Sequence, residues 1–125
     1  MEYYYEKLEV WQKARNVVKL IYQETEKFPN SELFGLSIQM RRAAVSVASN
    51  IAEGSCRTSE KDKSRFYEIS YGSVVELRVQ ATLAHDLKYL SDENLNLLIQ
   101  EFDQIARMLS GLRRRTINRG KSTPQ

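Results

Sequence analysis

The sequence predicts an all-α protein, an antiparallel up-down bundle of four helices in a single domain. The chain has 125 residues, which suffice for one hydrophobic core. Apolar residues recur at steps of three and four along four segments joined by short connections, which is typical of such bundles. Only 5 Gly and 2 Pro are present, too few for a sandwich or barrel, which needs a turn about every 8–12 residues. We place the bundle domain at residues 1–118 and expect residues 119–125 to form a polar, basic, disordered tail.

The first two helices are delimited by residues that favour helix ends. A helix is expected over residues 5–25, because its apolar residues share one face. Pro29 ends this segment, since proline lacks an amide donor and disfavours helix in the residue before it. A second helix is expected over residues 38–53, with Ser37 as its N-cap and Gly54 ending it in a left-handed conformation.

The third and fourth helices carry long apolar stripes. A third helix is expected over residues 60–90, with Ser59 as its N-cap. Gly72 lies inside it, where close packing against a neighbour is the expected reason for a glycine. Ser91 is expected to cap the fourth helix. The expected core stripes are Phe66, Ile69, Ser73, Leu77, Gln80, Leu83 or Ala84, Leu87 and Leu90 on the third helix, and Leu95, Leu98, Phe102, Ile105, Leu109 and Leu112 on the fourth.

Composition excludes several classes of protein. Hydrophobic residues make up 42% of the chain and charged residues 28%, as in ordinary globular proteins, and no run of about 18 apolar residues is present to span a membrane. Cys56 is the single cysteine and the N-terminus lacks the pattern of a signal peptide, so we expect a cytoplasmic protein. His85 is the single histidine, which excludes a multi-histidine metal site within one chain; no metal and no cofactor are expected.

Positive charge is concentrated in the later part of the chain. The net charge is +3, and residues 41–125 carry 14 of the 19 basic residues but 10 of the 16 acidic ones. The ends of the second and fourth helices and the start of the third would meet at one pole of an antiparallel bundle, which predicts a nucleic-acid-binding surface. The alternative is a set of favourable helix-end charges followed by a solubilising tail. The candidate residues are Arg41, Arg57, Lys61, Lys63, Arg65, Arg113, Arg114, Arg115, Arg119 and Lys121.

A polar stripe runs along the second helix among small apolar residues. The third helix presents polar residues at similar spacing, and an ion pair between Arg42 and Glu76 would fit across the contact. Three interpretations stay open: a structural polar network inside the bundle or at a subunit contact, a face toward water, and a ligand site. The expected network comprises Gln39, Arg42, Ser46, Asn50, Glu53, Ser73 and Glu76.

Enzymatic interpretations have little support. The Glu-x-x-His motifs of a di-iron bundle are absent, and Cys56 and His85 form no nucleophile–base motif. Arg78 and His85 are seven residues apart, hence on one helical face. This spacing resembles the loose Arg-x6-His motif of a class of helical ribonucleases, in which arginine stabilises phosphate charge and histidine transfers protons. The motif is short and permissive, so no catalytic residue is assigned and no enzyme is expected.

A set of short motifs along the chain forms one pattern. The motifs are Val10-Trp11-Gln12-Lys13-Ala14, Phe28-Pro29, Glu32, Phe34-Gly35-Leu36, Gln39, Arg41-Arg42-Ala43-Ala44-Val45-Ser46-Val47, Ser49-Asn50-Ile51-Ala52-Glu53-Gly54, Arg57, Ile69-Ser70-Tyr71-Gly72-Ser73 and Glu76-Leu77. This pattern resembles the family of small four-helix-bundle proteins encoded in intervening sequences of bacterial 23S ribosomal RNA genes. The resemblance extends from about Leu8 to Leu112, and Ala48 stands where the family often has proline.

The resemblance implies an up-down bundle that assembles as a homopentameric ring. The family also includes the basic accessory protein of diversity-generating retroelements, which partners a reverse transcriptase and binds nucleic acid. A second face of the third helix suits contact between copies, because Tyr, Val and Arg favour interfaces. The alternative is that these side chains lie at the edge of the bundle. The interface candidates are Tyr67, Tyr71, Val74 and Arg78.

These observations predict a non-enzymatic oligomeric helical scaffold that binds RNA or DNA through a basic pole. The alternative is a protein-binding adaptor with no role in nucleic-acid binding. A minor alternative is a metal-independent ribonuclease that uses Arg78 and His85. The expected partners are therefore further copies of the chain, then RNA or DNA, or a protein under the alternative, and no membrane.

Overall fold

The computed structural model describes residues 3–122 and folds them almost entirely into helix, with no strand in this range. Four α-helices follow one another along the chain, which confirms the all-α, four-helix prediction. The elements are η1 (Tyr4–Lys7), α1 (Glu9–Glu26), η2 (Asn30–Glu32), α2 (Leu36–Ser55), α3 (Glu60–Asp86) and α4 (Asp92–Ser122), where η denotes a 3-10 turn.

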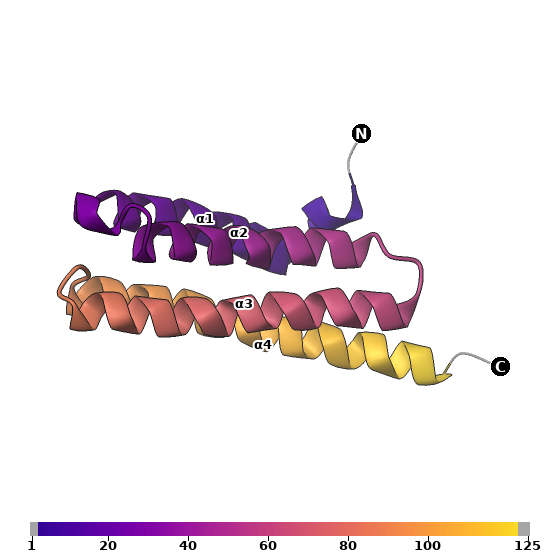
Figure 1. The fold of residues 1–125 in the computed structure, drawn as a ribbon. Coiled ribbons are helices and arrows are strands. Elements are labelled where there is room, and N and C mark those ends of the chain that lie inside the picture. Colours follow the sequence, from indigo (N-terminus) through magenta and orange to yellow (C-terminus); the bar gives the residue numbers. More distant parts are fainter. Residues whose placement is uncertain (1–2, 123–125) are drawn as a thin grey trace.

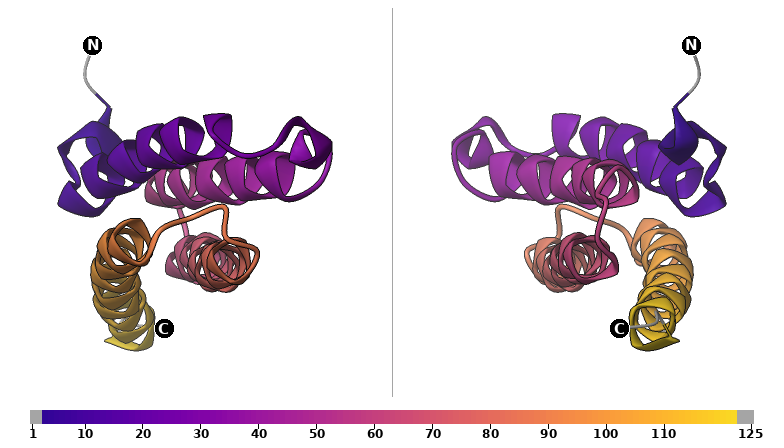
Figure 2. Two further views of the ribbon diagram at one scale, coloured as in Figure 1. Left: turned by 90° about the vertical axis from the view of Figure 1, so that its left-hand side faces the viewer. Right: turned by 90° about the vertical axis from the view of Figure 1, so that its right-hand side faces the viewer.

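The helices pack as two layers (Figure 1). Figure 2 shows α1 and α2 extended across the view while α3 is seen end-on, so the first pair of helices lies across the second pair. α3 packs against both α2 and α4, and α1 packs against α2. Two hydrogen bonds join α1 to α4: Lys13 Nζ donates to Gln104 Oε1 at 2.9 Å, and Asn94 Nδ2 donates to Glu24 Oε1 at 3.1 Å. The residue numbers therefore rise along α1 as they fall along α4.

The apolar stripe of α4 is buried as the sequence predicts. Leu98, Phe102, Ile105 and Leu109 are buried, and Leu95 and Leu112 pack against the same core from its margins. Burying a side chain of this size contributes about 1.5–3 kcal/mol, so this stripe is a principal source of stability.

Two of the three predicted serine N-caps are confirmed. Ser59 Oγ accepts a hydrogen bond from the Asp62 amide at 3.0 Å, and Ser91 Oγ accepts one from the Asn94 amide at 3.1 Å. The prediction for Ser37 is wrong, because α2 begins at Leu36, two residues earlier than predicted, and Ser37 is buried inside it. A carboxylate performs the capping instead: Glu32 Oε1 accepts from the Leu36 amide at 3.1 Å, and Tyr89 Oη donates to Glu32 Oε2.

Two glycines have other roles than predicted. Gly54 does not end α2 in a left-handed conformation; the helix continues through Ser55, and Gly54 is buried against the ring of Tyr67. A Cβ on Gly54 would lie 2.7 Å from Tyr67 Cε1, so close packing of α2 on α3 requires glycine here. Gly72, for which close packing was predicted, is exposed and has nothing within 4 Å of a built Cβ.

α3 buries most of its predicted stripe but ends earlier than predicted. Ser73, Leu77, Gln80 and Leu90 are buried, as is Ala84, one of the two alternatives at positions 83 and 84, whereas Ile69 and Leu87 are exposed. The helix ends at Asp86 because Lys88 adopts a left-handed conformation with φ 65°. The Tyr89 amide then donates to Ala84 O and the Lys88 amide to His85 O, the bonds of a Schellman motif. The buried residues of α3 are Tyr67, Ser70, Ser73, Val74, Leu77, Gln80, Ala81 and Ala84.

Candidate nucleic-acid interface

Nine basic residues gather at one end of the molecule, and we call this end the basic pole. α2 ends, α3 begins and α4 ends there (Figure 1), so segments far apart in the sequence converge. The residues are Arg57, Lys61, Lys63, Arg65, Arg113, Arg114, Arg115, Arg119 and Lys121. The same segments, residues 53–68 and 113–122, contain four acidic residues: Glu53, Glu60, Asp62 and Glu68.

Arg41 does not belong to the basic pole, which corrects the prediction for this residue. It lies in the second turn of α2, and its Nε donates to Thr25 Oγ1 at 2.8 Å, next to the last turn of α1. Its guanidinium also stacks over Tyr22 at 4.6 Å from the ring centre. The helical rise from Arg41 to Ser55, the last residue of α2, is about 21 Å, and Arg57 follows that end, so Arg41 and Arg57 lie near opposite ends of α2.

Residues 119–122 extend α4 and complete the basic pole. They were predicted as part of a disordered tail, whereas α4 continues through Ser122; residues 123–125 of that predicted tail lie outside the described residues. Gly120 lies beside the start of α3, since a Cβ built there would be 3.5 Å from Glu60 Cβ, an ordinary contact distance. The last turn of α4 therefore packs beside the first turn of α3.

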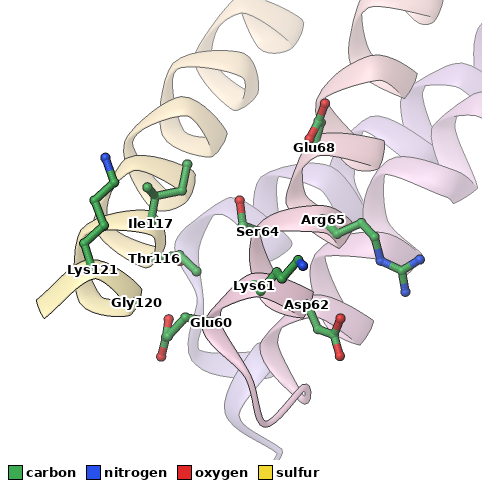
Figure 3. Close-up of a pocket in the computed structure, with 10 residues that line it drawn as sticks. All are labelled: Glu60, Lys61, Asp62, Ser64, Arg65, Glu68, Thr116, Ile117, Gly120 and Lys121. Carbon is green, nitrogen blue, oxygen red and sulfur yellow. The ribbon is translucent and has the colours of Figure 1, made fainter. Parts of the chain in front are cut away.

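A groove of about 560 Å³ runs between these two helix ends (Figure 3). Lys61 and Arg65 extend from α3 and Lys121 from α4, with the apolar Ile117 between them along α4. Glu60 and Glu68 also line the groove, so its charge is mixed. Figure 3 shows the Arg65 guanidinium and the Lys121 amine pointing away from the facing helix, so these cations lie at the outer rims of the groove, where a polyanion that crosses the helix ends would meet them.

Some of these cations are paired and others are not. Three ion pairs join Arg57 to Glu53, Lys63 to Glu60 and Arg113 to Glu68, at 3.4, 3.8 and 3.6 Å. Such partly exposed pairs contribute little to stability, so they leave the cations available to an incoming phosphate. Five other cations of the basic pole form no ion pair with a described residue: Lys61, Arg65, Arg114, Arg115 and Lys121.

Aromatic side chains lie among the charges of the basic pole. Phe66 is stacked by two guanidinium groups, Arg57 at 4.5 Å and Arg65 at 5.2 Å from its ring centre. A second hollow, of about 350 Å³, is lined by Tyr4 and Tyr67 together with three basic residues, Lys63, Arg115 and Arg119. Sequence reasoning missed Tyr4, although the run of tyrosines at positions 3–5 was a visible signal.

The phenol of Tyr67 is the most strongly perturbed titratable group of this region. Burial raises the pKa of Tyr67 from 10.0 to about 12, and the neighbouring Tyr4 and Glu60 add to the increase. At neutral pH the phenol is therefore uncharged and forms a polar part of the hollow's wall.

The predicted polar network forms only in part. Ser46 Oγ and Ser73 Oγ lie 2.8 Å apart, and Asn50 Nδ2 donates to Ser46 O at 2.8 Å. The ion pair between Arg42 and Glu76 does not form, and Glu76 instead accepts from Gln80 Nε2 at 3.2 Å. The remaining members, Gln39 and Glu53, are exposed, and Glu53 pairs with a residue of the basic pole.

The predicted subunit-contact face lies mostly inside the subunit. Tyr67 and Val74 are each 2% exposed, so the prediction is wrong for these two residues; Tyr71 packs against the same core. Arg78 is exposed but pairs with Asp103 of α4 at 3.2 Å. The exposed apolar side chains of α3 form a different row, which we call the outer stripe: Ile69, Val75, Val79, Leu83 and Leu87.

The three residues considered as catalytic candidates, Cys56, Arg78 and His85, are either far apart or paired with carboxylates. His85 Nε2 contacts Asp92 and its Nδ1 lies 3.8 Å from Asp86, while Arg78 is held by Asp103. Cys56 follows α2 directly and His85 lies in the last turn of α3, so the two residues are at opposite ends of the molecule. Among the described residues, no group of three or more His, Cys, Asp or Glu side chains is arranged to hold a metal ion. None of the described helices is both long and apolar enough to pass through a membrane.

A family model described as 23S rRNA-intervening sequence protein matches residues 6–111. No curated protein matches the chain. The matched range includes every helix except the last part of α4, which supplies several cations of the basic pole.

Proposed function

Because the chain belongs to the 23S rRNA-intervening sequence protein family, we propose that it is a non-enzymatic, oligomeric helical scaffold that binds RNA or DNA through its basic pole. The observation that carries the proposal is the convergence of nine basic and four acidic residues from three helix ends. This local excess exceeds the net charge of the whole chain, which is +3. A polyanion is the partner that such a surface attracts.

The end of the molecule opposite the basic pole has an excess of acidic residues, which would orient an approaching nucleic acid. Its segments, residues 24–41 and 85–93, contain six acidic and three basic residues. A nucleic acid would be repelled there and attracted to the basic pole, so the charge distribution selects one end for contact.

We further propose that copies of the antiparallel up-down bundle assemble as a homopentameric ring. The outer stripe of α3 supports association, because a row of exposed apolar side chains on one helix is suited to burial against another subunit. A ring would place several basic poles side by side, which strengthens binding through multiple simultaneous contacts. The exposed free thiol of Cys56 is compatible with a reducing cytoplasm, where we place the protein.

A protein-binding adaptor is the second candidate, since the same outer stripe would serve a different protein equally well. The ribonuclease is weaker, because Arg78 and His85 each contact a carboxylate of α4. Catalysis would require both side chains to leave these partners and meet at one phosphate.

Charge reversal at the two ends tests the proposal. The double variant Lys61→Glu/Lys121→Glu alters two exposed lysines of the groove that have no ion pair with another described residue. We expect it to weaken binding of a labelled RNA at least about tenfold in low salt, measured by fluorescence anisotropy. The matched control, Lys27→Glu/Lys88→Glu, makes the same change in net charge at the opposite end. Equal losses in both variants, or no binding by the unaltered protein, would contradict the assignment of the site.

A further inference from the structure

Tyr4 is an exposed aromatic side chain beside cations of the basic pole. It is 60% exposed and lines the hollow of about 350 Å³ with Lys63, Arg115 and Arg119. We propose that this hollow binds single-stranded nucleic acid, with an unpaired base stacked on Tyr4 and the adjoining phosphates near the surrounding cations. The inference rests on the proposed function and specifies the class of nucleic acid.

The packing of η1 leaves Tyr4 facing outward. Tyr5 contacts Trp11 edge to face, with ring centres 4.8 Å apart, and Tyr3 stacks on Tyr5. Gln12 Nε2 donates to Glu6 O at 2.9 Å and ties the turn to α1. The neighbours of Tyr4 therefore anchor the segment, and the Tyr4 ring is available to a ligand.

The composition of the hollow favours a nucleotide over a purely anionic ligand. Leu8 and Leu112 contribute apolar surface, and three residues with hydroxyl groups, Ser55, Tyr67 and Thr116, also line the hollow. A base has a flat apolar face and polar edges, so it matches this mixture, whereas a bare phosphate would use the cations alone. The volume falls near the lower end of small-ligand pockets, about 300–1,000 Å³, which suits part of one strand.

Stacking requires an unpaired base. In a duplex, both faces of each base are covered by its neighbours, and only groove edges and phosphates are accessible. The Arg57–Phe66–Arg65 stack adds a second surface of flat groups on another side of α3, where further unpaired bases can stack on guanidinium planes. Aromatic and basic side chains interleaved in this way are typical of single-strand binding surfaces.

The test compares Tyr4→Ala with Tyr4→Phe on two probes. The probes are a labelled RNA single strand and the same strand annealed to its complement, and binding is measured by fluorescence anisotropy. Tyr4→Ala is expected to weaken single-strand binding at least about fivefold, because each stacked base contributes substantially, and to leave duplex binding unchanged. Tyr4→Phe keeps the ring and is expected to restore single-strand affinity. Phe34→Ala is the matched control, since Phe34 is an aromatic residue 91% exposed in the connection before α2, at the other end of the molecule.

The outcomes separate this inference from the proposed function. Unchanged single-strand affinity in Tyr4→Ala, or an equal loss for both probes, overturns the inference while the basic pole stands. Failure of the unaltered protein to bind either probe overturns both. Circular dichroism of each variant confirms that the helices are intact, which is expected because Tyr4 and Phe34 are both exposed.

Discussion

At the scale of single residues, Gly54 and Gly72 show that the surroundings of a glycine decide its role. Both lie inside helices, where glycine is less favourable than alanine by about 1 kcal/mol. Gly54 faces the rigid ring of Tyr67 and the Cβ of Phe66, whereas Gly72 faces open space. The same substitution should therefore have opposite effects at the two positions.

Gly54→Ala is expected to lower the free energy of unfolding by about 1–3 kcal/mol, because the added Cβ would lie 2.7 Å from Tyr67 Cε1 and force α2 and α3 apart. Gly72→Ala is expected to raise it by up to about 1 kcal/mol through helix propensity alone. Urea unfolding followed by circular dichroism measures both. A neutral or stabilising Gly54→Ala would contradict the close packing described here.

Tyr67 makes stability depend on alkaline pH. Burial raises the pKa of its phenol from 10.0 to about 12 in the folded protein. Because the pKa is higher in the folded than in the unfolded protein, the neutral phenol contributes its full stabilisation below pH 10. This contribution to the free energy of unfolding, about 3 kcal/mol, is lost as the pH rises toward 12. Tyr67→Phe cannot ionise, so its stability should fall less than that of the unaltered protein between about pH 9 and about pH 11.5, measured by urea unfolding. Parallel declines in the two proteins would show that Tyr67 is not responsible.

At the scale of helices, the sequence predicted the inward side of α4 fully and that of α3 only in part. α4 has one continuous apolar stripe with mostly polar residues elsewhere, Leu97 and Ile117 being exposed exceptions, so the stripe faces the core. α3 has apolar residues on almost every side, and its inward side depends on the shape of α2, where Gly54 admits the ring of Tyr67. Periodicity does not select between two neighbouring apolar sides, which is why Ile69 and Leu87 were misplaced and Leu83 was not distinguished from Ala84.

The outer stripe of α3 is expected to hold the subunits together. Leu83 is 48% exposed in the single subunit, so Leu83→Glu should leave the helix folded but prevent its burial against another copy. Leu97→Glu is the matched control, because Leu97 is a leucine 54% exposed on α4. Light scattering coupled to size-exclusion chromatography should show an oligomer for the unaltered protein and Leu97→Glu, and a smaller species for Leu83→Glu. A monomeric unaltered protein would contradict the ring.

At the scale of the whole molecule, the charges of the basic pole come together because the end of α2, the start of α3 and the end of α4 lie at the same end of the molecule. Nine of the ten basic residues predicted to share one end of the bundle do lie there, because a short connection places the end of one helix beside the start of the next. Arg41 was misplaced because it belongs to the start of α2 rather than its end. The run of tyrosines at positions 3–5 signalled an aromatic segment, but the grooves and the position of Tyr4 beside one of them depend on how far α4 extends and on where η1 packs, which the sequence alone does not show.

The most direct test of the account is the salt dependence of RNA binding by the unaltered protein. If the basic pole contacts phosphates, the logarithm of the association constant should fall linearly with the logarithm of the salt concentration, by about 0.7 per phosphate contacted on a single strand. A slope of about −3 or steeper, reduced in Lys61→Glu/Lys121→Glu, is the predicted result. A slope near zero, or no binding at low salt, would contradict it.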